Sequence, residues 1–146
     1  MVNFEIFFDG ACAPNNPGGH LGYGYIIYID GEYLFSDSFY EPENFNNTNN
    51  VAEYKALIEA IFKLQDYVEL NNIGEYYVFV CGDSKLVINQ MKGSWNINNG
   101  NYKSFAILAK RLIEKIPNIE FKWIPRELNT EADEMSKQEL LKIGIR

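Results

Sequence analysis

The chain has 146 residues, 47% hydrophobic and 15% aromatic, which is enough to bury the core of one ordinary domain. No apolar run is long enough to cross a bilayer, and the amino terminus enters a strand pattern without a basic leader. Cys12 and Cys81 lack metal-ligand spacing, so we expect free thiols rather than a disulfide. These features predict one domain over residues 1–146, no membrane association and a cytoplasmic location.

The formal net charge of −7 disfavours a nucleic-acid partner, because phosphates are bound through Lys and Arg. However, residues 1–84 contain two basic and 13 acidic side chains, whereas residues 85–146 contain 11 basic and seven acidic ones. This asymmetry is typical of a chain with a local surface for an anionic ligand. Lys-rich, solvated helix faces are the alternative explanation.

The first part of the chain predicts three strands, because its apolar residues alternate or form aromatic and β-branched runs. These strands are residues 4–8, 23–29 and 33–40. The first ends at Asp9-Gly10, residues 13–19 have turn composition, and Asp30-Gly31 is a hairpin signal. We therefore expect an antiparallel meander.

Helical periodicity begins after the Asn-rich loop 44–50. The remaining elements are a helix over residues 51–69, a strand at 76–81, helices at 84–93 and 102–115, a strand at 119–124 and a helix at 130–141. The order βββαβααβα predicts an α/β fold, a five-stranded mixed sheet with helices on its faces.

Four acidic residues lie where these predicted elements begin or end. Asp9 and Asp83 end buried strands, and the ends of adjacent strands are where site residues gather in α/β folds. Glu53 and Asp133 begin helices that must pack on the same sheet. Glu53 shares a helical face with apolar residues, so we expect its side chain to lean toward the packed side. A cluster of four carboxylates would require cations and would indicate a metal-dependent enzyme.

Taken singly, each acid also has an ordinary structural explanation. Asp9 is able to form a turn with the following glycine, and Glu53 fits a capping box with Asn50. Asp83 is able to cap the next helix, and Asp133 suits the dipole of a first helical turn. Both interpretations stay open for any one of the four.

Four segments, in order, resemble the type 1 ribonuclease H family from its first strand to its last helix. They are DGACAPNNPGGHLGYG at 9–24, TNNVAEYKAL at 48–57, GDSKLVINQMKGSW at 82–95 and WIPRELNTEADEMS at 123–136. The resemblance implies a ribonuclease H-like fold. It also implies an endonuclease that hydrolyses the RNA strand of RNA/DNA hybrids, leaving 5'-phosphate and 3'-hydroxyl ends.

The resemblance further implies that Asp9, Glu53, Asp83 and Asp133 are the catalytic metal ligands. Carboxylate oxygens suit two Mg²⁺ ions, with Mn²⁺ as a possible substitute, in a two-metal-ion displacement. By analogy with the family, Asp9 would bridge both ions. Asp83 and Glu53 would hold one ion and Asp133 would complete the other.

The resemblance places two groups of residues on the hybrid. Minor-groove contacts, which read 2'-hydroxyls, are implied for Gly10, Ala11, Cys12, Asn16, Asn49 and Asn50. Lys85 and Trp95 fall where the family holds the phosphates of the DNA strand. As alternatives, the asparagines are ordinary turn and cap residues and Trp95 is a core or helix-edge aromatic.

The loop before the fourth acid departs from the pattern of many relatives, which carry a histidine there. The only histidine of this chain is His20, so the sequence resembles the short-loop subgroup that lacks the loop histidine. Another nuclease or strand-transfer enzyme on the same fold, or a binding module without catalysis, are the alternative functions. The other enzymes on this fold would share the acids but should lack the TNN and DGA signatures. A binding module has no reason to keep a self-repelling cluster of all four acids. The charged helix faces predict a monomer.

Overall fold

The structure is a computed structural model that describes residues 1–145. Its elements are β1 (Val2–Ala13), β2 (His20–Ile29), β3 (Glu32–Glu41), α1 (Asn49–Leu70), β4 (Tyr76–Gly82), α2 (Lys85–Lys92), α3 (Lys103–Ile113), β5 (Ile119–Trp123) and α4 (Thr130–Lys142). A short 3-10 helix, η1 (Arg126–Leu128), precedes α4. The predicted order βββαβααβα is confirmed.

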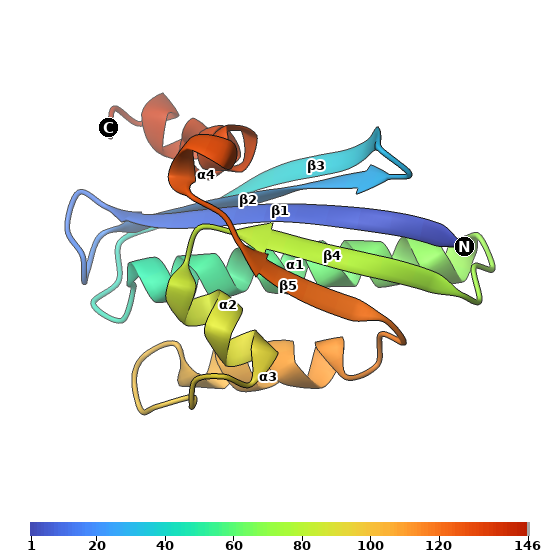
Figure 1. The fold of residues 1–146 in the computed structure, drawn as a ribbon. Coiled ribbons are helices and arrows are strands. Elements are labelled where there is room, and N and C mark those ends of the chain that lie inside the picture. The colour runs from blue at the N-terminus through green and yellow to red at the C-terminus, as the bar shows by residue number, and fades with distance from the viewer. Residues whose placement is uncertain (146) are drawn as a thin grey trace.

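The five strands form one mixed sheet in the order β3-β2-β1-β4-β5. The first three strands are the predicted antiparallel meander, and β4 and β5 extend the sheet in parallel with β1 (Figure 1). The parallel register sets Phe7 beside Cys81. Two residues further along each segment are Asp9 and Asp83, so the topology brings these two acids to the same edge.

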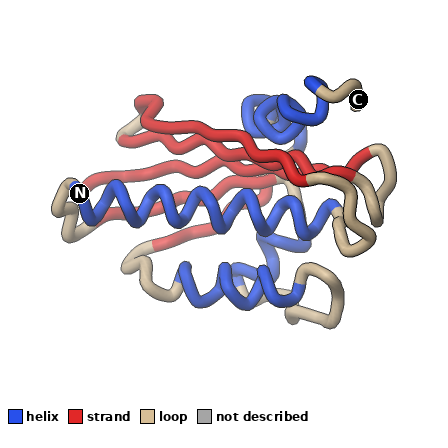
Figure 2. Tube along the Cα trace, turned by 180° about the vertical axis from the view of Figure 1, so that it is seen from behind, coloured by secondary structure: helices blue, strands red, loops and turns tan. Residues whose placement is uncertain are grey.

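Helices cover both faces of the sheet. Figures 1 and 2 show α1 along one face and α4 on the other, with α3 beside α1. Because side chains alternate along β1, Phe4, Ile6 and Phe8 all lie on the face that α1 covers. Each of them is at most 1% exposed. The Phe4 ring packs edge-on against Tyr67 of α1, with centroids 6.0 Å apart. This core supports the strands that carry the acidic residues.

Two glycines allow the helices to approach the sheet at main-chain distance. A Cβ atom at Gly10 would lie 2.4 Å from the carbonyl carbon of Ala52, and one at Gly22 would lie 2.1 Å from the carbonyl oxygen of Ser136. Any larger residue would push α1 or α4 away. The contact at Gly10 sets the next residue of α1, Glu53, beside β1.

Three sequence-based expectations about the acids were wrong. First, β1 does not end at Asp9-Gly10 but continues to Ala13, because its last residues pair with the start of β2. Asp9 is therefore a strand residue and not part of a turn. Second, Thr48 caps α1 by accepting a hydrogen bond from the N–H of Val51, so Glu53 belongs to no capping box with Asn50.

Third, Ser84, and not Asp83, caps α2. Its hydroxyl accepts a hydrogen bond from the N–H of Val87 at 3.2 Å. By contrast, Asp133 lies in the first turn of α4, as expected. Local capping thus accounts for neither Glu53 nor Asp83, and both carboxylates are left for another role.

The free state expected for the two cysteines is matched by the structure. Cys12 and Cys81 are both buried, free thiols. Within residues 1–145, no helix has the length and apolar character needed to cross a membrane.

Candidate active site

Three of the four predicted acids meet where β1 and β4 separate. Asp9 lies in β1, Glu53 lies in α1 and Asp83 directly follows β4. One carboxylate oxygen of each lies within 4.8 Å of the other two. Asp9 is 4% exposed and Glu53 is 9% exposed. The side chain of Glu53 leans toward the packed side of α1, as the helical pattern predicted.

Burial and mutual repulsion oppose the ionisation of all three carboxyl groups at once. Burial, the Asp83 carboxylate and a hydrogen bond with Asp133 raise the pKa of Asp9 to about 8. Burial, followed by repulsion from Asp9 and Asp83, raises the pKa of Glu53 well above its usual range. The Ser84 hydroxyl and Arg126 oppose that shift only in part. The three carboxyl groups therefore need more positive charge nearby if all are to be ionised. Their hard oxygen ligands fit a divalent cation such as Mg²⁺ or Mn²⁺.

The fourth acid, Asp133, lies at the border of this cluster and outside its 4.8 Å limit. The Lys137 ammonium is 3.2 Å from both oxygens of Asp133 and donates to Oδ2. Oδ1 is buried and accepts no hydrogen bond from the described residues. Ser136 donates to the Asp133 carbonyl at 2.7 Å and lies 3.4 Å from Asp9 Oδ2. Asp133 is thus held next to Asp9 but is already paired with a lysine.

Sequence reasoning missed two residues that hold Asp83. The Asn129 amide donates to Asp83 Oδ2 at 3.3 Å and to the Phe8 carbonyl at 3.0 Å. Trp123 donates from Nε1 to the main-chain oxygen of Asp83 at 3.0 Å. The only sequence signal for Asn129 is its place just before a helix, where asparagine is common. Trp123 gave no signal beyond the end of a strand.

The residues expected to contact a minor groove gather beside Glu53. The N–H of Cys12 donates to Asn49 Oδ1 at 2.8 Å, and the N–H of Asn49 donates to Asn16 Oδ1 at 3.1 Å. Asn49 and Asn50 begin α1 rather than end a loop, which corrects the predicted helix start. These bonds join the β1–β2 connection to the helix that carries Glu53.

The residues expected to hold DNA phosphates lie on and after α2. Lys85 follows Ser84 directly, and its ammonium lies 4.9 Å from the centre of the Trp123 ring. Trp95 follows α2 and is 47% exposed, so it is not a core aromatic, whereas its position matches the helix-edge alternative. Both side chains are exposed, and Lys85 lies two residues after Asp83.

Comparisons with known proteins agree with this fold. A family model described as Reverse transcriptase-like matches residues 8–139. The bifunctional protein Rv2228c of Mycobacterium tuberculosis is 34% identical over 122 residues, which cover 83% of this chain and 31% of that protein. The chain thus spans about a third of the length of the first curated relatives it matches.

Solved structures are similar over the whole domain. LC11-RNase H1, isolated from compost by a metagenomic approach, has a TM-score of 0.83 at 34% identity, with 98% of this chain and 99% of that chain covered. LC11-RNase H1 in complex with RNA/DNA hybrid has a TM-score of 0.78 at 31% identity, with 94% and 95% covered.

The mixed sheet, its helices and the carboxylate cluster at the strand ends define a protein of the ribonuclease H-like class. Within that class the family model and the matched relatives agree. The chain belongs to the type 1 ribonuclease H family.

Proposed function

We propose that residues 1–146 form a single ribonuclease H domain, an endonuclease that hydrolyses the RNA strand of RNA/DNA hybrids. The main support is the group of three carboxylates within 4.8 Å, two of them buried, just beyond the point where the pairing of β1 with β4 stops. The solved complex of LC11-RNase H1 with RNA/DNA hybrid supports the choice of substrate.

The proposed cofactor is a pair of Mg²⁺ ions, for which Mn²⁺ is a possible substitute. Asp9, Glu53, Asp83 and Asp133 would hold them. Bound at these acids, the ions would supply an activated water that attacks the phosphorus and stabilisation of the leaving 3'-oxygen. Breakage of the P–O3' bond would then give 3'-hydroxyl and 5'-phosphate ends.

The acids contribute by their burial and their charge. Because burial raises the pKa of Asp9 and Glu53, a bound cation would offset the cost of ionising these carboxyls. Asp83 is fixed from two sides by Asn129 and Trp123, so its carboxylate is oriented before the substrate arrives. Because Asp133 is paired with Lys137, its carboxylate would be the least available of the four for binding a cation.

Hybrid recognition is proposed for the residues around this cluster. Gly10, Ala11, Cys12, Asn16, Asn49 and Asn50 would read the minor groove, where the 2'-hydroxyls distinguish RNA from DNA. Lys85 and Trp95 would contact the DNA strand, because an exposed ammonium attracts phosphates and an indole N–H is able to donate to a phosphate oxygen. The hydrogen bonds that join Cys12, Asn49 and Asn16 support one continuous surface. We further propose that the protein acts as a monomer in the cytoplasm.

The test is incubation of the purified protein with labelled RNA/DNA hybrid, duplex RNA and duplex DNA, each with Mg²⁺, Mn²⁺ or a chelator. We expect cleavage of the RNA strand of the hybrid alone, with 5'-phosphate ends, and none with the chelator. Cleavage of duplex DNA, or hybrid cleavage that persists undiminished with the chelator, would contradict the proposal.

A further inference from the structure

Asn129 is the residue before α4, yet its side chain does not cap the helix. Asparagine at this position commonly accepts a hydrogen bond from an N–H of the first turn. Here the side chain makes no such bond. It is only 2% exposed, and its amino group donates instead to the Phe8 carbonyl and to Asp83 Oδ2. The amide is therefore directed at the strands that carry the acids.

The orientation of this amide follows from its neighbours. Both contact atoms, the Phe8 carbonyl oxygen and the Asp83 carboxylate oxygen, are acceptors, so only the amino end of the amide fits against them. Asn129 Oδ1 is then buried and has no hydrogen-bond partner among the described residues. A buried, unpartnered oxygen is unfavourable. Helix capping and packing do not account for an asparagine at this position.

Asn129 connects the segments that carry three of the four acids. Its amide contacts Phe8, the residue before Asp9, and it contacts the carboxylate of Asp83 directly. Its main-chain oxygen accepts the first helical hydrogen bond of α4, from the N–H of Asp133 at 3.0 Å. One residue thus joins β1, the end of β4 and the start of α4.

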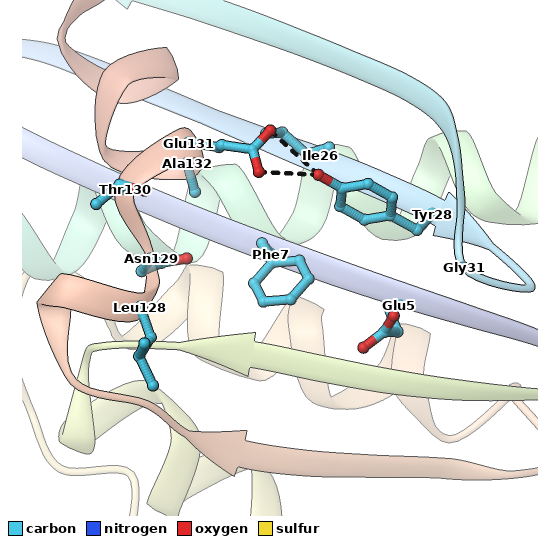
Figure 3. Close-up of a pocket in the computed structure, with 10 residues that line it drawn as sticks. All are labelled: Glu5, Phe7, Ile26, Tyr28, Gly31, Leu128, Asn129, Thr130, Glu131 and Ala132. Atoms are coloured by element: carbon cyan, nitrogen blue, oxygen red, sulfur yellow. Dashed lines mark hydrogen bonds between the residues drawn. The ribbon is translucent and has the colours of Figure 1, made fainter.

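A hydrogen bond from β2 also holds the start of α4. Figure 3 shows a second anchor, in which the Tyr28 hydroxyl donates to the two Glu131 carboxylate oxygens at 3.0 and 3.1 Å. Asn129 and Glu131 both line a hollow of about 250 Å³ whose floor includes Phe7.

We propose that Asn129 is a positioning residue for the metal site, an inference that rests on the proposed function. Its amide holds one oxygen of Asp83 and so orients the carboxylate for a cation. A neutral donor suits this task, because a lysine or arginine would neutralise Asp83 and compete with the metal. A carboxylate at this position would repel Asp83. Groups that hydrogen-bond to a metal ligand commonly alter metal affinity when removed.

The test measures Mg²⁺ and Mn²⁺ binding by titration calorimetry in the absence of hybrid. Asn129→Ala and the similarly sized Asn129→Leu both remove the amide, and we expect affinity to fall by about 10-fold or more. Asn118→Ala is the matched control. The side-chain amide of Asn118 donates a hydrogen bond to the Tyr76 carbonyl at 3.2 Å, at the opposite end of β4. The control is expected to alter stability but not affinity.

A second measurement needs no variant. In the NMR spectrum of the wild-type protein, the side-chain amide resonances of Asn129 should shift on addition of Mg²⁺, whereas those of Asn118 should not. A folded Asn129 variant with wild-type affinity overturns the inference, as does an Asn129 resonance that does not respond. If neither variant folds, the wild-type resonance decides. Wild-type protein that binds no Mg²⁺ would contradict the proposed function itself, which is a different result.

Discussion

The carboxylate cluster and the two residues proposed to contact the DNA strand are held in different ways. Asp9 and Glu53 are buried and are placed by strand register and by the close approach at Gly10. Lys85 and Trp95 are exposed side chains on or after a short helix. Main-chain geometry thus positions the carboxylates, whereas exposed side chains with freedom to adjust provide the proposed surface for the DNA strand.

The largest expected effect comes from removing one charge of the cluster. Asp83→Asn should reduce hybrid cleavage on the order of 1,000-fold, as does loss of a principal electrostatic group in other active sites. The metal-free fold should be equally stable or slightly more stable, because repulsion within the cluster is relieved. Cleavage rates and urea unfolding in chelator measure the two effects. A clear loss of stability would show that Asp83 has a structural role instead.

The close approach of α4 to the sheet is tested by Gly22→Ala. The new methyl would overlap the Ser136 carbonyl, so we expect a loss of about 1–3 kcal/mol in the free energy of unfolding. Cleavage should also fall, because α4 carries Asp133. Gly74→Ala is the control, since no atom lies within 4 Å of the added carbon and the backbone is not in the left-handed region. Equal stability of the two variants, measured in urea, would rule out main-chain placement of α4.

When the metal is removed, this cluster should make the stability of the protein fall as the pH rises. Ion-paired carboxylates usually have the opposite effect. The pKa of Asp9 is raised from 3.8 to about 8 in the folded protein, and that of Glu53 is raised in the same direction. Between these values the folded state binds more protons than the unfolded state, so stability falls as pH rises.

The measurement is the urea midpoint of the chelated protein at about pH 5 and about pH 8, repeated with Mg²⁺. The midpoint should be lower at the higher pH with chelator, and Mg²⁺ should reduce the difference. Asp9→Asn should remove much of this pH dependence. A midpoint that increases toward the higher pH in chelator would contradict the raised pKa values.

The same contrast explains what the sequence was able to predict. Strand alternation in β1 and helical spacing in α1 are local patterns, so the element order and the inward lean of Glu53 were predictable. The true length of β1 depends on its pairing with His20 and the residues after it. The contacts of Asn129 and Trp123 with Asp83 join residues 46 and 40 positions apart. No local pattern encodes such contacts, and only the resemblance to a family placed these segments together.

The smallest expected effect belongs to the exposed surface. Lys85→Ala should raise KM for the hybrid a few-fold and leave kcat nearly unchanged, because one phosphate contact is lost while the carboxylates stay in place. The slope of log affinity against log salt should fall by about one. Lys142→Ala removes the same charge at the far end of α4, where Lys142 pairs with Glu139, and serves as the control. An equal change in both variants would show that only the overall charge matters. A change in kcat for Lys85→Ala would instead place that lysine, through its neighbour Trp123, among the groups that hold Asp83.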